Sequence, residues 1–436
     1  MRPHKERVGF AGSVSLSHSN VNRDRSCAAL TALVMSVGVC VRTCAEGFRN
    51  PPAGAFNLGR AGGRIAQIDD SSAVAQNPAN LMDLQGPDFV VAPSVVYIHV
   101  DYKSPSGATA ETKLPWKLLP NGFAALPFME GKFAVGLGIT TPYGLSNEWD
   151  QKGAFADMAN GSSLRYQAPH FTELKTINCN PTVAARLCDR VTAGVGLDVF
   201  WSELNFMQFL TPLAPTLEAK AKGDGVGVGG NLGITWEITK RQRLAVTYRS
   251  QVDVDYDGHF DLKNVAIVGT SRSDFSSRLK FPNIVAVGYG IKVSDAIRLE
   301  GDVEWIQFSR FDNLPVNVGS NPVGFPSTTI RQDWKDTFTA GIAGDWEFAH
   351  GWAARAGYQF YESPVPDETF SPTIPDGNQN VLTVALRYSH KRHSLEFAYG
   401  ADFYDRRRIT NDQNPGFNGT YDITVHLFAF NYRFSF

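Results

Sequence analysis

Strict alternation of apolar and polar side chains runs through most of the chain after Gly86. In the stretch around residue 342, Phe338 and Trp346 fall on one face, whereas Thr339 and Asp345 fall on the other. The same alternation occurs over residues 226–238, 244–255 and 394–403. A period of two is the period of a β-strand, in which successive side chains point to opposite faces. The sequence therefore predicts an all-β fold.

Alternation alone fits two folds, a soluble β-sandwich with its apolar face inward and a membrane barrel with its apolar face toward lipid. The polar faces carry glycine together with charge, which suits the crowded polar lumen of a barrel. Several stretches exceed the five or six residues that are usual for a sandwich strand. Four tryptophans near predicted strand ends fit an interfacial girdle: Trp201, Trp305, Trp346 and Trp352. We therefore predict a transmembrane barrel, closed because lipid cannot satisfy unpaired backbone groups.

The links between the predicted strands alternate between short and long. Those interpreted as tight turns are residues 130–132, 188–190, 240–242, 294–296, 350–351 and 391–393. The longer polar or Pro/Gly-rich links are near residues 104–117, 150–162, 210–223, 257–276, 310–330, 364–378 and 405–418. Short periplasmic turns opposite long external loops are typical of outer-membrane barrels. Counting between the links predicts about fourteen antiparallel strands, an even number as expected, over residues 88–436.

The last segment of the chain strengthens this prediction. Phe428, Phe430, Tyr432 and Phe434 alternate with polar residues, and the chain ends at Phe436. A terminal phenylalanine that closes an aromatic strand resembles the signal recognised by the assembly machinery of outer-membrane barrels. We therefore expect that machinery and the lipids of the outer membrane as partners.

Residues 1–45 are interpreted as an amino-terminal extension and a signal peptide. Arg23 and Arg25 precede an apolar run over residues 27–41, and cleavage after Ala45 fits the small residues there. The run is shorter than the roughly 20 apolar residues that a membrane-spanning helix needs. The chain is therefore expected to be exported.

Of the five cysteines, only Cys179 and Cys188 lie beyond the predicted signal peptide. An even number in an exported protein suggests a disulfide. On one strand, however, nine residues at about 3.3 Å each would separate them by about 30 Å, whereas a disulfide tolerates about 7 Å between Cα atoms. We therefore expect two free thiols, unless the strand is broken between them.

Composition and motifs argue against several other classes of protein. With 41 basic and 43 acidic residues, the chain offers no basic face for a nucleic acid. Zinc-protease, phosphate-loop and nucleophile-elbow motifs do not occur, and the nine histidines are scattered. We expect no cofactor, no metal site and no enzymatic activity. An outer-membrane lipase or protease remains an alternative, and it leaves three histidines to check: His99, His170 and His426.

Residues 46–87 do not alternate and are rich in Gly, Ala, Asn and Asp. Such a segment ahead of a barrel is either a disordered leader or a plug folded inside the lumen. Apolar residues recur within it, at Phe48, Phe56, Leu58, Ile65, Ile68 and Leu81. Their presence favours an ordered plug.

The chain resembles the FadL family of outer-membrane long-chain fatty acid transporters. The resemblance spans roughly residue 46 to the end and rests on many short segments in the same order. They are Gly47-Phe48, Leu58-Gly59-Arg60-Ala61, Asp69-Asp70, Asn77-Pro78-Ala79, Thr141-Pro142-Tyr143-Gly144-Leu145-Ser146, residues 244–250, Trp334-Lys335-Asp336, residues 363–367 and Ile374-Pro375-Asp376.

The resemblance implies a fourteen-stranded barrel closed by an amino-terminal hatch, with passive transport of hydrophobic molecules. It implies gating by the hatch, here represented by Asn77, Pro78 and Ala79. It also implies sideways release of substrate at a kink in the third strand. Pro142, Tyr143 and Gly144 occupy that position, and a proline without an N–H and a glycine without a side chain cannot sustain a regular ladder. A plain bulge with no role in transport is the alternative.

The resemblance also indicates residues that could contact a substrate. Arg331 is close to where family members place a basic pocket residue, whereas Gln208 replaces a second basic residue of well-known members. Apolar residues after the fifth strand, including Phe209, Leu210 and Leu213, could form an external collecting groove or could simply pack loops together. The expected cargo is a long-chain fatty acid, with aromatic or aliphatic hydrocarbons as the alternative. We expect a monomer in the outer membrane of a Gram-negative bacterium.

Overall fold

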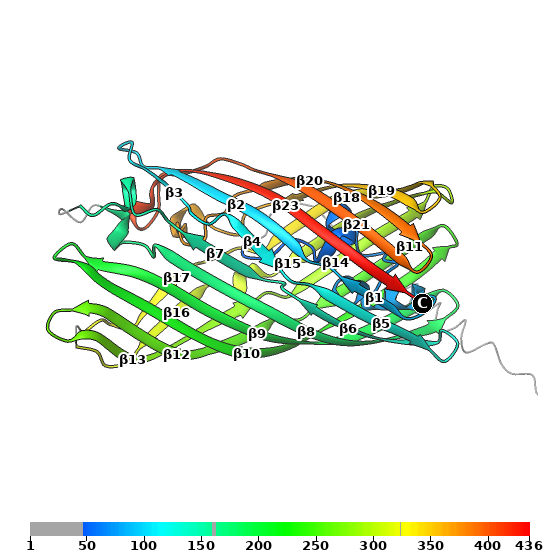
Figure 1. Ribbon diagram of the computed structural model, residues 1–436, viewed down its shortest axis with the longest axis horizontal. Helices are drawn as coiled ribbons and strands as arrows, with labels where there is room; N and C mark the ends of the chain where they lie inside the picture. Colours follow the sequence, from blue (N-terminus) through cyan, green and yellow to red (C-terminus); the bar gives the residue numbers. More distant parts are fainter. Residues whose placement is uncertain (1–46, 159–162, 323) are drawn as a thin grey trace, which may run out of the picture. The chain divides into compact units, whose positions relative to one another are not determined.

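The computed structural model describes residues 47–436 apart from residues 159–162 and 323. These residues form an antiparallel β-barrel of fourteen strands that is closed on itself (Figure 1). Closure is made by the last strand, which pairs with the first through Phe89–Phe434 and Tyr97–His426. The predicted all-β barrel is confirmed, while the predicted signal peptide lies outside the described residues.

Some of the barrel strands are interrupted, so the sheet consists of 23 segments. The first half comprises β1 (Asp88–Val91), β2 (Ser94–Lys103), β3 (Thr109–Glu111), β4 (Trp116–Leu119), β5 (Gly122–Phe128), β6 (Phe133–Thr140), β7 (Gly144–Glu148), β8 (Phe171–Cys188), β9 (Val191–Thr211), β10 (Ala214–Thr239), β11 (Gln242–Arg249) and β12 (Val252–Val265). The second half comprises β13 (Gly269–Phe281), β14 (Ile284–Lys292), β15 (Ile297–Ile306), β16 (Asn313–Val318), β17 (Thr328–Arg331), β18 (Thr337–Ala349), β19 (Trp352–Tyr361), β20 (Gln379–His390), β21 (His393–Tyr404), β22 (Arg407–Ile409) and β23 (Gly419–Ser435).

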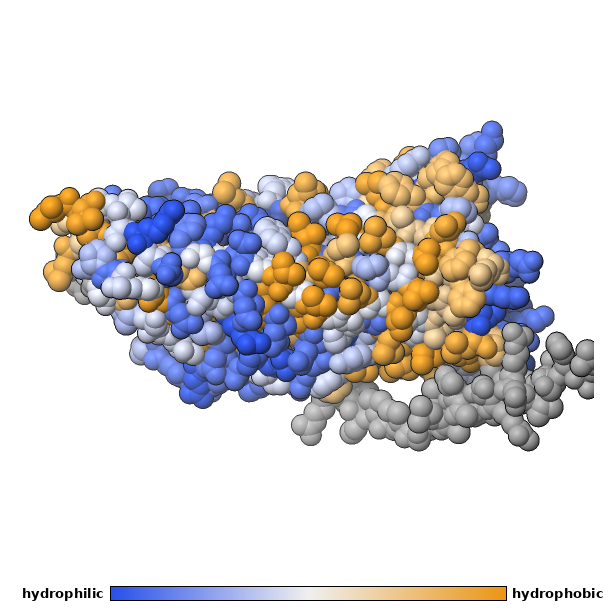
Figure 2. All heavy atoms as spheres, turned by 90° about the horizontal axis from the view of Figure 1, so that it is seen from below, coloured by the Kyte–Doolittle hydropathy of each residue, from blue (hydrophilic) through white to orange (hydrophobic). Residues whose placement is uncertain are grey.

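The two faces of the wall follow the alternation in the sequence. On β18, Ile342 and Trp346 point outward and are 63% and 54% exposed, whereas Thr339 and Asp345 are buried inside. Figure 2 shows hydrophobic residues gathered over one part of the barrel surface and hydrophilic residues covering the other part. An apolar outer band around a polar interior is the arrangement that a lipid bilayer requires.

The six predicted tight turns are confirmed, because each falls in the short gap between two consecutive strands. Two of the predicted long loops are wrong. Residues 210–223 and 257–276 are mostly strand, since β9 turns into β10 within two residues and β12 turns into β13 within three. Beyond the apolar band the polarity of the two faces reverses, because Ala219 and Phe260 are buried on the inner face whereas Lys220 and Lys222 alternate with the buried residues on the outer face. The alternation there therefore differs from that of the membrane-spanning stretches. Shorter strands also lie inside the predicted loops 104–117 and 310–330.

Two further details differ from expectation. Trp201 lies in the middle of β9 rather than near its end, because β9 continues well past the predicted loop boundary. Cys179 is a free thiol, as expected, and is not joined to Cys188. Cys188 is disulfide-bonded, so the expectation of a free thiol is wrong there.

Residues 47–87, which we call the hatch, contain α2 (Gly54–Gly59), α3 (Ala73–Gln76) and η1 (Pro78–Asp83). Its six apolar residues named above are all buried. Helix α2 contacts β19, β20, β21 and β23, whereas η1 contacts β8, β9 and β10. Since these strands stand on different sides of the wall, the hatch lies inside the bore, where Figure 1 shows it in blue.

The remaining short helices lie in loops or strand breaks. They are η2 (Gly153–Phe155), η3 (Leu164–Tyr166), η4 (Phe308–Arg310), η5 (Asp367–Thr369) and η6 (Pro415–Phe417). No helix in the described part of the chain combines the length and the apolar character needed to cross a membrane.

Candidate functional site

A cavity of about 680 Å³ begins at the hatch and reaches the outer surface of the barrel. Its inner lining includes Asn50 and Leu427, and its outer lining includes Trp116 and Leu118, which are 59% and 66% exposed on the wall. Most of the lining is apolar. The cavity therefore passes through the wall of the barrel.

The passage exists because the ladder between the second and third barrel strands is interrupted. Strand β5 pairs with β6 only as far as Gly122–Ile139. Further along, β4 pairs with β2, and β7 pairs with β8, without a ladder between β4 and β7 in the described chain. The two sides meet again at the bridge between Thr112 and Trp149. Between these points the wall has a side opening, which we call the lateral opening.

The predicted kink borders this opening. Strand β6 ends at Thr140 and β7 begins at Gly144, so Pro142 and Tyr143 interrupt the third strand. Tyr143, Gly144 and the neighbouring Ser146 line the cavity. The irregularity is therefore part of the cavity wall, and not merely a bulge in a sealed sheet.

The start of the hatch is hydrogen-bonded directly to the kink. The Asn50 N–H donates to the Pro142 carbonyl at 3.0 Å, and the Gly144 N–H donates to the Phe48 carbonyl at 3.1 Å. The Asn50 side chain also donates to the Thr141 carbonyl at 2.8 Å. Hatch and kink therefore form one short antiparallel pair, and a displacement of either would break these bonds.

Phe48 occupies the centre of an aromatic cluster. Its ring centroid lies 5.2 Å from that of Trp334 and 5.8 Å from that of Tyr143. Three more rings surround it, those of Phe281, Phe308 and Phe311. Offset and edge-to-face contacts of this kind add to the stability that burial provides. The cluster fixes the first residues of the hatch against the inner wall.

A loop carboxyl group also contacts the first residues of the hatch. Asp376, in the loop between β19 and β20, accepts hydrogen bonds from the Ser363 hydroxyl at 2.7 Å and from the Gly47 N–H. Burial raises the pKa of Asp376 to about 6. The hydrogen bond from the Gly47 N–H favours the charged form of this carboxyl group, whereas burial favours its neutral form.

The middle of the hatch is held by buried ion pairs with the wall. Arg60 pairs with Glu300 at 2.9 Å, and Arg64 pairs with Glu304. All four side chains are almost inaccessible to water. Breaking a buried pair by removing one partner costs about 3–5 kcal/mol, because the other charge is left uncompensated.

The Asn77-Pro78-Ala79 segment adds hydrogen bonds within the hatch and to the wall. The Asn77 amide donates to the Ile65 carbonyl at 2.8 Å and to the Thr235 hydroxyl of β10 at 2.9 Å, and its oxygen accepts from the Ala79 N–H. Asn77 thus joins two hatch turns to β10. Whether this segment gates transport stays a prediction.

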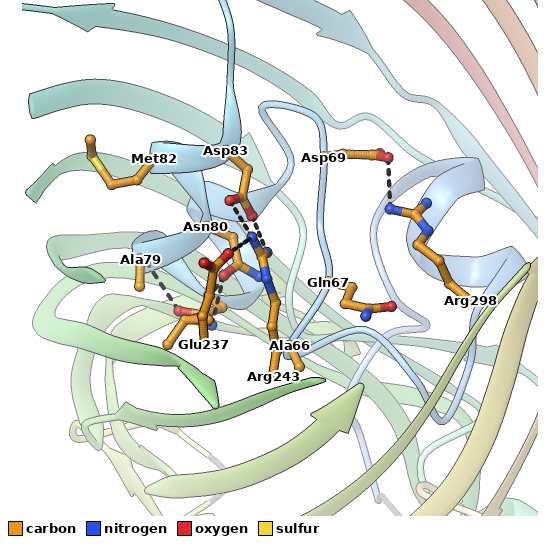
Figure 3. A network of polar contacts seen from close by, with 12 residues as sticks. Ala66, Gln67, Asp69, Ala79, Asn80, Met82, Asp83, Glu237, Arg243 and Arg298 are labelled. Atoms are coloured by element: carbon orange, nitrogen blue, oxygen red, sulfur yellow. Dashed lines mark hydrogen bonds and ion pairs between the residues drawn. The ribbon is translucent and has the colours of Figure 1, made fainter. Parts of the chain in front are cut away.

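Two arginines of the wall form further ion pairs with the hatch (Figure 3). Arg243 of β11 donates to Asp83 at 2.8 Å and to Glu237 at 2.6 Å, and Arg298 of β15 pairs with Asp69 at 3.0 Å. Figure 3 shows these side chains reaching the hatch from the surrounding strands. Wall residues therefore hold the hatch from several directions.

The two predicted headgroup residues lie away from the cavity. Arg331 of β17 is 61% exposed at its side chain and pairs with Asp333. Gln208 of β9 donates to the Tyr166 carbonyl at 3.3 Å. Neither lines the cavity. Their role in binding a carboxylate stays a prediction that the geometry does not support.

The apolar residues after the fifth strand are spread over the upper part of β9 and the turn that follows. Phe209 stacks on His170 at 4.9 Å and lies under the Arg165 guanidinium at 3.6 Å. Leu210 packs against the main apolar cluster, whereas Leu213 is 94% exposed. Only Leu213 is therefore presented fully to solvent.

The three histidines considered for catalysis have other partners. His170 contacts Glu218 at 3.0 Å, and His426 contacts the Tyr399 hydroxyl at 3.0 Å. His99 lies 3.5 Å from Asp101, and with Glu111 these residues bring three potential metal-ligand atoms within 4.8 Å of one another on the outer rim. None of these contacts joins a histidine to a serine hydroxyl in the described chain.

Strand β4 was not predicted from the sequence, because most of this segment falls in a predicted external loop. Trp116 and Leu118 point outward, while Lys117 and Leu119 point inward. The alternation covers only four residues and follows Pro115, which is too short a signal to be recognised among loop residues.

A family model described as "Outer membrane protein transport protein (OMPP1/FadL/TodX)" matches residues 36–436. A long-chain fatty acid transport protein of Salmonella typhi is 25% identical over 444 residues, which cover 93% of this chain and 98% of the relative. A 47 kDa outer membrane protein of Pasteurella multocida is also 25% identical, covering 89% of this chain and 94% of the relative.

Two solved structures share the fold. A FadL homologue of Pseudomonas aeruginosa has a TM-score of 0.76 at 18% identity, covering 90% of this chain and 100% of that one. The toluene transporter TodX of P. putida has a TM-score of 0.71 at 16% identity, covering 89% and 99%.

Proposed function

Because the chain belongs to the OMPP1/FadL/TodX family of outer-membrane transport proteins, we propose that its cargo is a long-chain fatty acid. Transport of hydrophobic compounds across the outer membrane is common to the family. The curated relatives at about 25% identity include long-chain fatty acid transport proteins, which supports this cargo.

The observation that carries the proposal is the apolar cavity that connects the hatch with the lateral opening. A fatty acid would be collected at the outer loops, with Phe209, Leu210 and Leu213 as contacts, and would pass into the cavity. It would leave sideways past Pro142, Tyr143 and Gly144 into the membrane. An apolar chain on this path remains out of water, which avoids the cost of hydrating it.

The hatch supplies the gate in this proposal. Residues 48–50 are bonded to the kink, so their displacement would free the inner side of the lateral opening. Asn77, Pro78 and Ala79 would hold the rest of the hatch in place during this movement. No energy source is needed, since the cargo moves down its own gradient.

Aromatic or aliphatic hydrocarbons are the second candidate cargo. Two structural neighbours are named as toluene transporters, and neither Arg331 nor Gln208 lines the cavity to receive a carboxylate. A hydrocarbon needs only the apolar lining. The relatives are transporters rather than enzymes, which leaves the hydrolase alternative without support.

Obstruction of the lateral opening tests the proposal. Ser146→Trp places an indole in the cavity, and the protein would be reconstituted into liposomes with labelled oleate or toluene outside. We expect wild-type protein to accelerate oleate uptake and Ser146→Trp to reduce this uptake at least tenfold. Asn77→Ala would remove hydrogen bonds that hold the hatch and should change the rate of oleate uptake.

Ser106→Trp, in the exposed turn after β2, is the matched control and should transport like wild type. Heat-dependent migration in gels shows that each variant has formed a barrel. Equal oleate uptake by wild type and Ser146→Trp would exclude the lateral route, and uptake of toluene alone would favour the second cargo.

A further inference from the structure

The charged residues of the cavity are unevenly balanced. Four basic and two acidic residues line it: Arg49, Lys113, Lys117, Lys175, Glu173 and Asp402. Charges interact more strongly where water is partly excluded, so the partner of each cationic group decides whether the cavity can receive an anion.

Three of the four basic residues already have a carboxylate partner. Arg49 pairs with Glu304 at 2.6 Å, Lys113 with Asp150 at 3.4 Å, and Lys175 with Glu173 at 2.8 Å. Lys117 has no carboxylate within 4 Å in the described residues. The polar contact described for its ammonium group is the Ser146 hydroxyl, at 3.2 Å.

Lys117 is also placed where cargo must pass. It points inward from β4, whereas its neighbours Trp116 and Leu118 face the outside of the wall. Ser146 belongs to β7, on the other side of the lateral opening (Figure 1). The Lys117 side chain therefore reaches across the lateral opening from β4 to β7. Apolar residues such as Leu119 and Leu145 also line the cavity there.

We propose that Lys117 binds the carboxylate of the cargo at the lateral opening and thereby selects alkyl carboxylates over uncharged hydrocarbons. This inference rests on the proposed function and specifies its substrate class. The carboxylate replaces the Ser146 hydroxyl as the partner of the ammonium group, and the alkyl chain lies along the apolar lining. A charge-assisted hydrogen bond of this kind is stronger than the bond to a neutral hydroxyl.

A structural role is the competing explanation, in which Lys117 only ties β4 to β7. The two roles differ in their response to Ser146→Ala. That change removes the tie while leaving the ammonium group, so carboxylate binding should survive it. Lys117→Met removes the charge but keeps an unbranched apolar chain, and Lys117→Arg keeps the charge. Lys152→Met, which removes an exposed ammonium group paired with Asp150 outside the cavity lining, is the matched control.

The test measures binding and transport separately on the full-length protein. Purified protein in neutral detergent is titrated with oleate and with oleyl alcohol, which has the same chain without the charge. Uptake of both compounds is then measured in liposomes of phosphatidylcholine. This lipid carries no net charge, so the added fatty acid is the anionic amphiphile in the experiment. We expect Lys117→Met to weaken oleate binding and slow oleate uptake roughly tenfold, with oleyl alcohol unchanged. Lys117→Arg and Lys152→Met should remain close to wild type, and Ser146→Ala should keep the preference for oleate over oleyl alcohol.

The possible failures can be distinguished. If Lys117→Met affects oleate and oleyl alcohol equally, or affects neither, the assignment of Lys117 is wrong while transport stands. If Ser146→Ala reproduces Lys117→Met, the lysine is a structural tie. If the wild-type protein binds oleate through Lys117 but does not carry it into liposomes, the proposed function fails and the binding site remains. If it binds neither compound, both proposals fall.

Discussion

The middle and the start of the hatch are held in the barrel by different kinds of interaction. The middle is fixed by buried ion pairs from Arg60 and Arg64 to β15. The start, residues 47–50, is docked by a few backbone hydrogen bonds, by the packing of Phe48 and by one ion pair, in which Arg49 keeps some exposure to water. Buried charges are costly to separate, whereas exchangeable backbone bonds and apolar contacts can reform elsewhere. The difference indicates that the start can move while the middle stays in place.

The largest effect is expected from breaking the firmly held part. Arg64→Met removes the side-chain partner of the buried Glu304 carboxylate and of the Gln359 amide oxygen, and it should destabilise the docked hatch by about 3–5 kcal/mol. Amide hydrogen exchange over residues 54–84 should rise strongly, while the barrel strands remain protected. Arg278→Met is the control, because the pair of Arg278 with Asp253 is largely exposed and should contribute at most about 1 kcal/mol. Unchanged exchange in Arg64→Met would show that the ion pairs do not hold the hatch.

A smaller effect is expected from pH at the docked start. Burial raises the pKa of Asp376 to about 6, above its ordinary value of 3.8. Undocking that exposed this carboxyl group to water would return its pKa toward 3.8, so docking should be strongest below about pH 4 and should weaken as the pH rises to about 6. The change should not exceed about 3 kcal/mol.

Hydrogen exchange of residues 47–50, corrected for the intrinsic rate at each pH, measures this dependence. The Asp376→Asn variant should lose it, since the amide does not titrate in this range. A pH response of the same size in Asp376→Asn would assign the effect to another group.

The smallest effect is expected at the contact between hatch and kink. A Cβ atom at Gly144 would lie 3.0 Å from the Asn50 side-chain nitrogen, so Gly144→Ala should push Asn50 away and weaken docking by about 1 kcal/mol. Exchange of the Asn50 amide should become roughly fivefold faster. Gly122→Ala is the control, since its Cβ would be an ordinary 3.6 Å from the nearest atom. Equal effects of the two changes would argue against a specific contact.

The strands that face lipid on one side and the lumen on the other could be predicted from the sequence. The alternation around residue 342 identified a strand and both of its faces, because lipid outside and polar lumen inside leave different residues on each side. The same reasoning failed for the ends of β9, β10, β12 and β13, where inward side chains such as Phe206 and Phe260 are apolar, the reverse of the membrane-spanning pattern.

The candidate site was only partly predictable. Proline and glycine at 142 and 144 revealed the kink, since the sequence itself shows that a ladder cannot continue there. The pairing of Arg60 and Arg64 with β15 could not be predicted, because their partners are more than 230 residues away. Lys117 carries no local signal either. Its significance depends on a gap between strands, which is a property of the tertiary fold.

The parts of β9, β10, β12 and β13 that extend beyond the apolar band also affect the energetics of solute movement. Their inward-facing residues, among them Phe260 and Phe206, belong to or pack on the same apolar cluster as Phe48. A solute that follows this surface would exchange one hydrocarbon contact for another at each step. Its free-energy profile would then be nearly flat after the initial loss of hydration water, so the rate of permeation would be set by capture and release rather than by the length of the path.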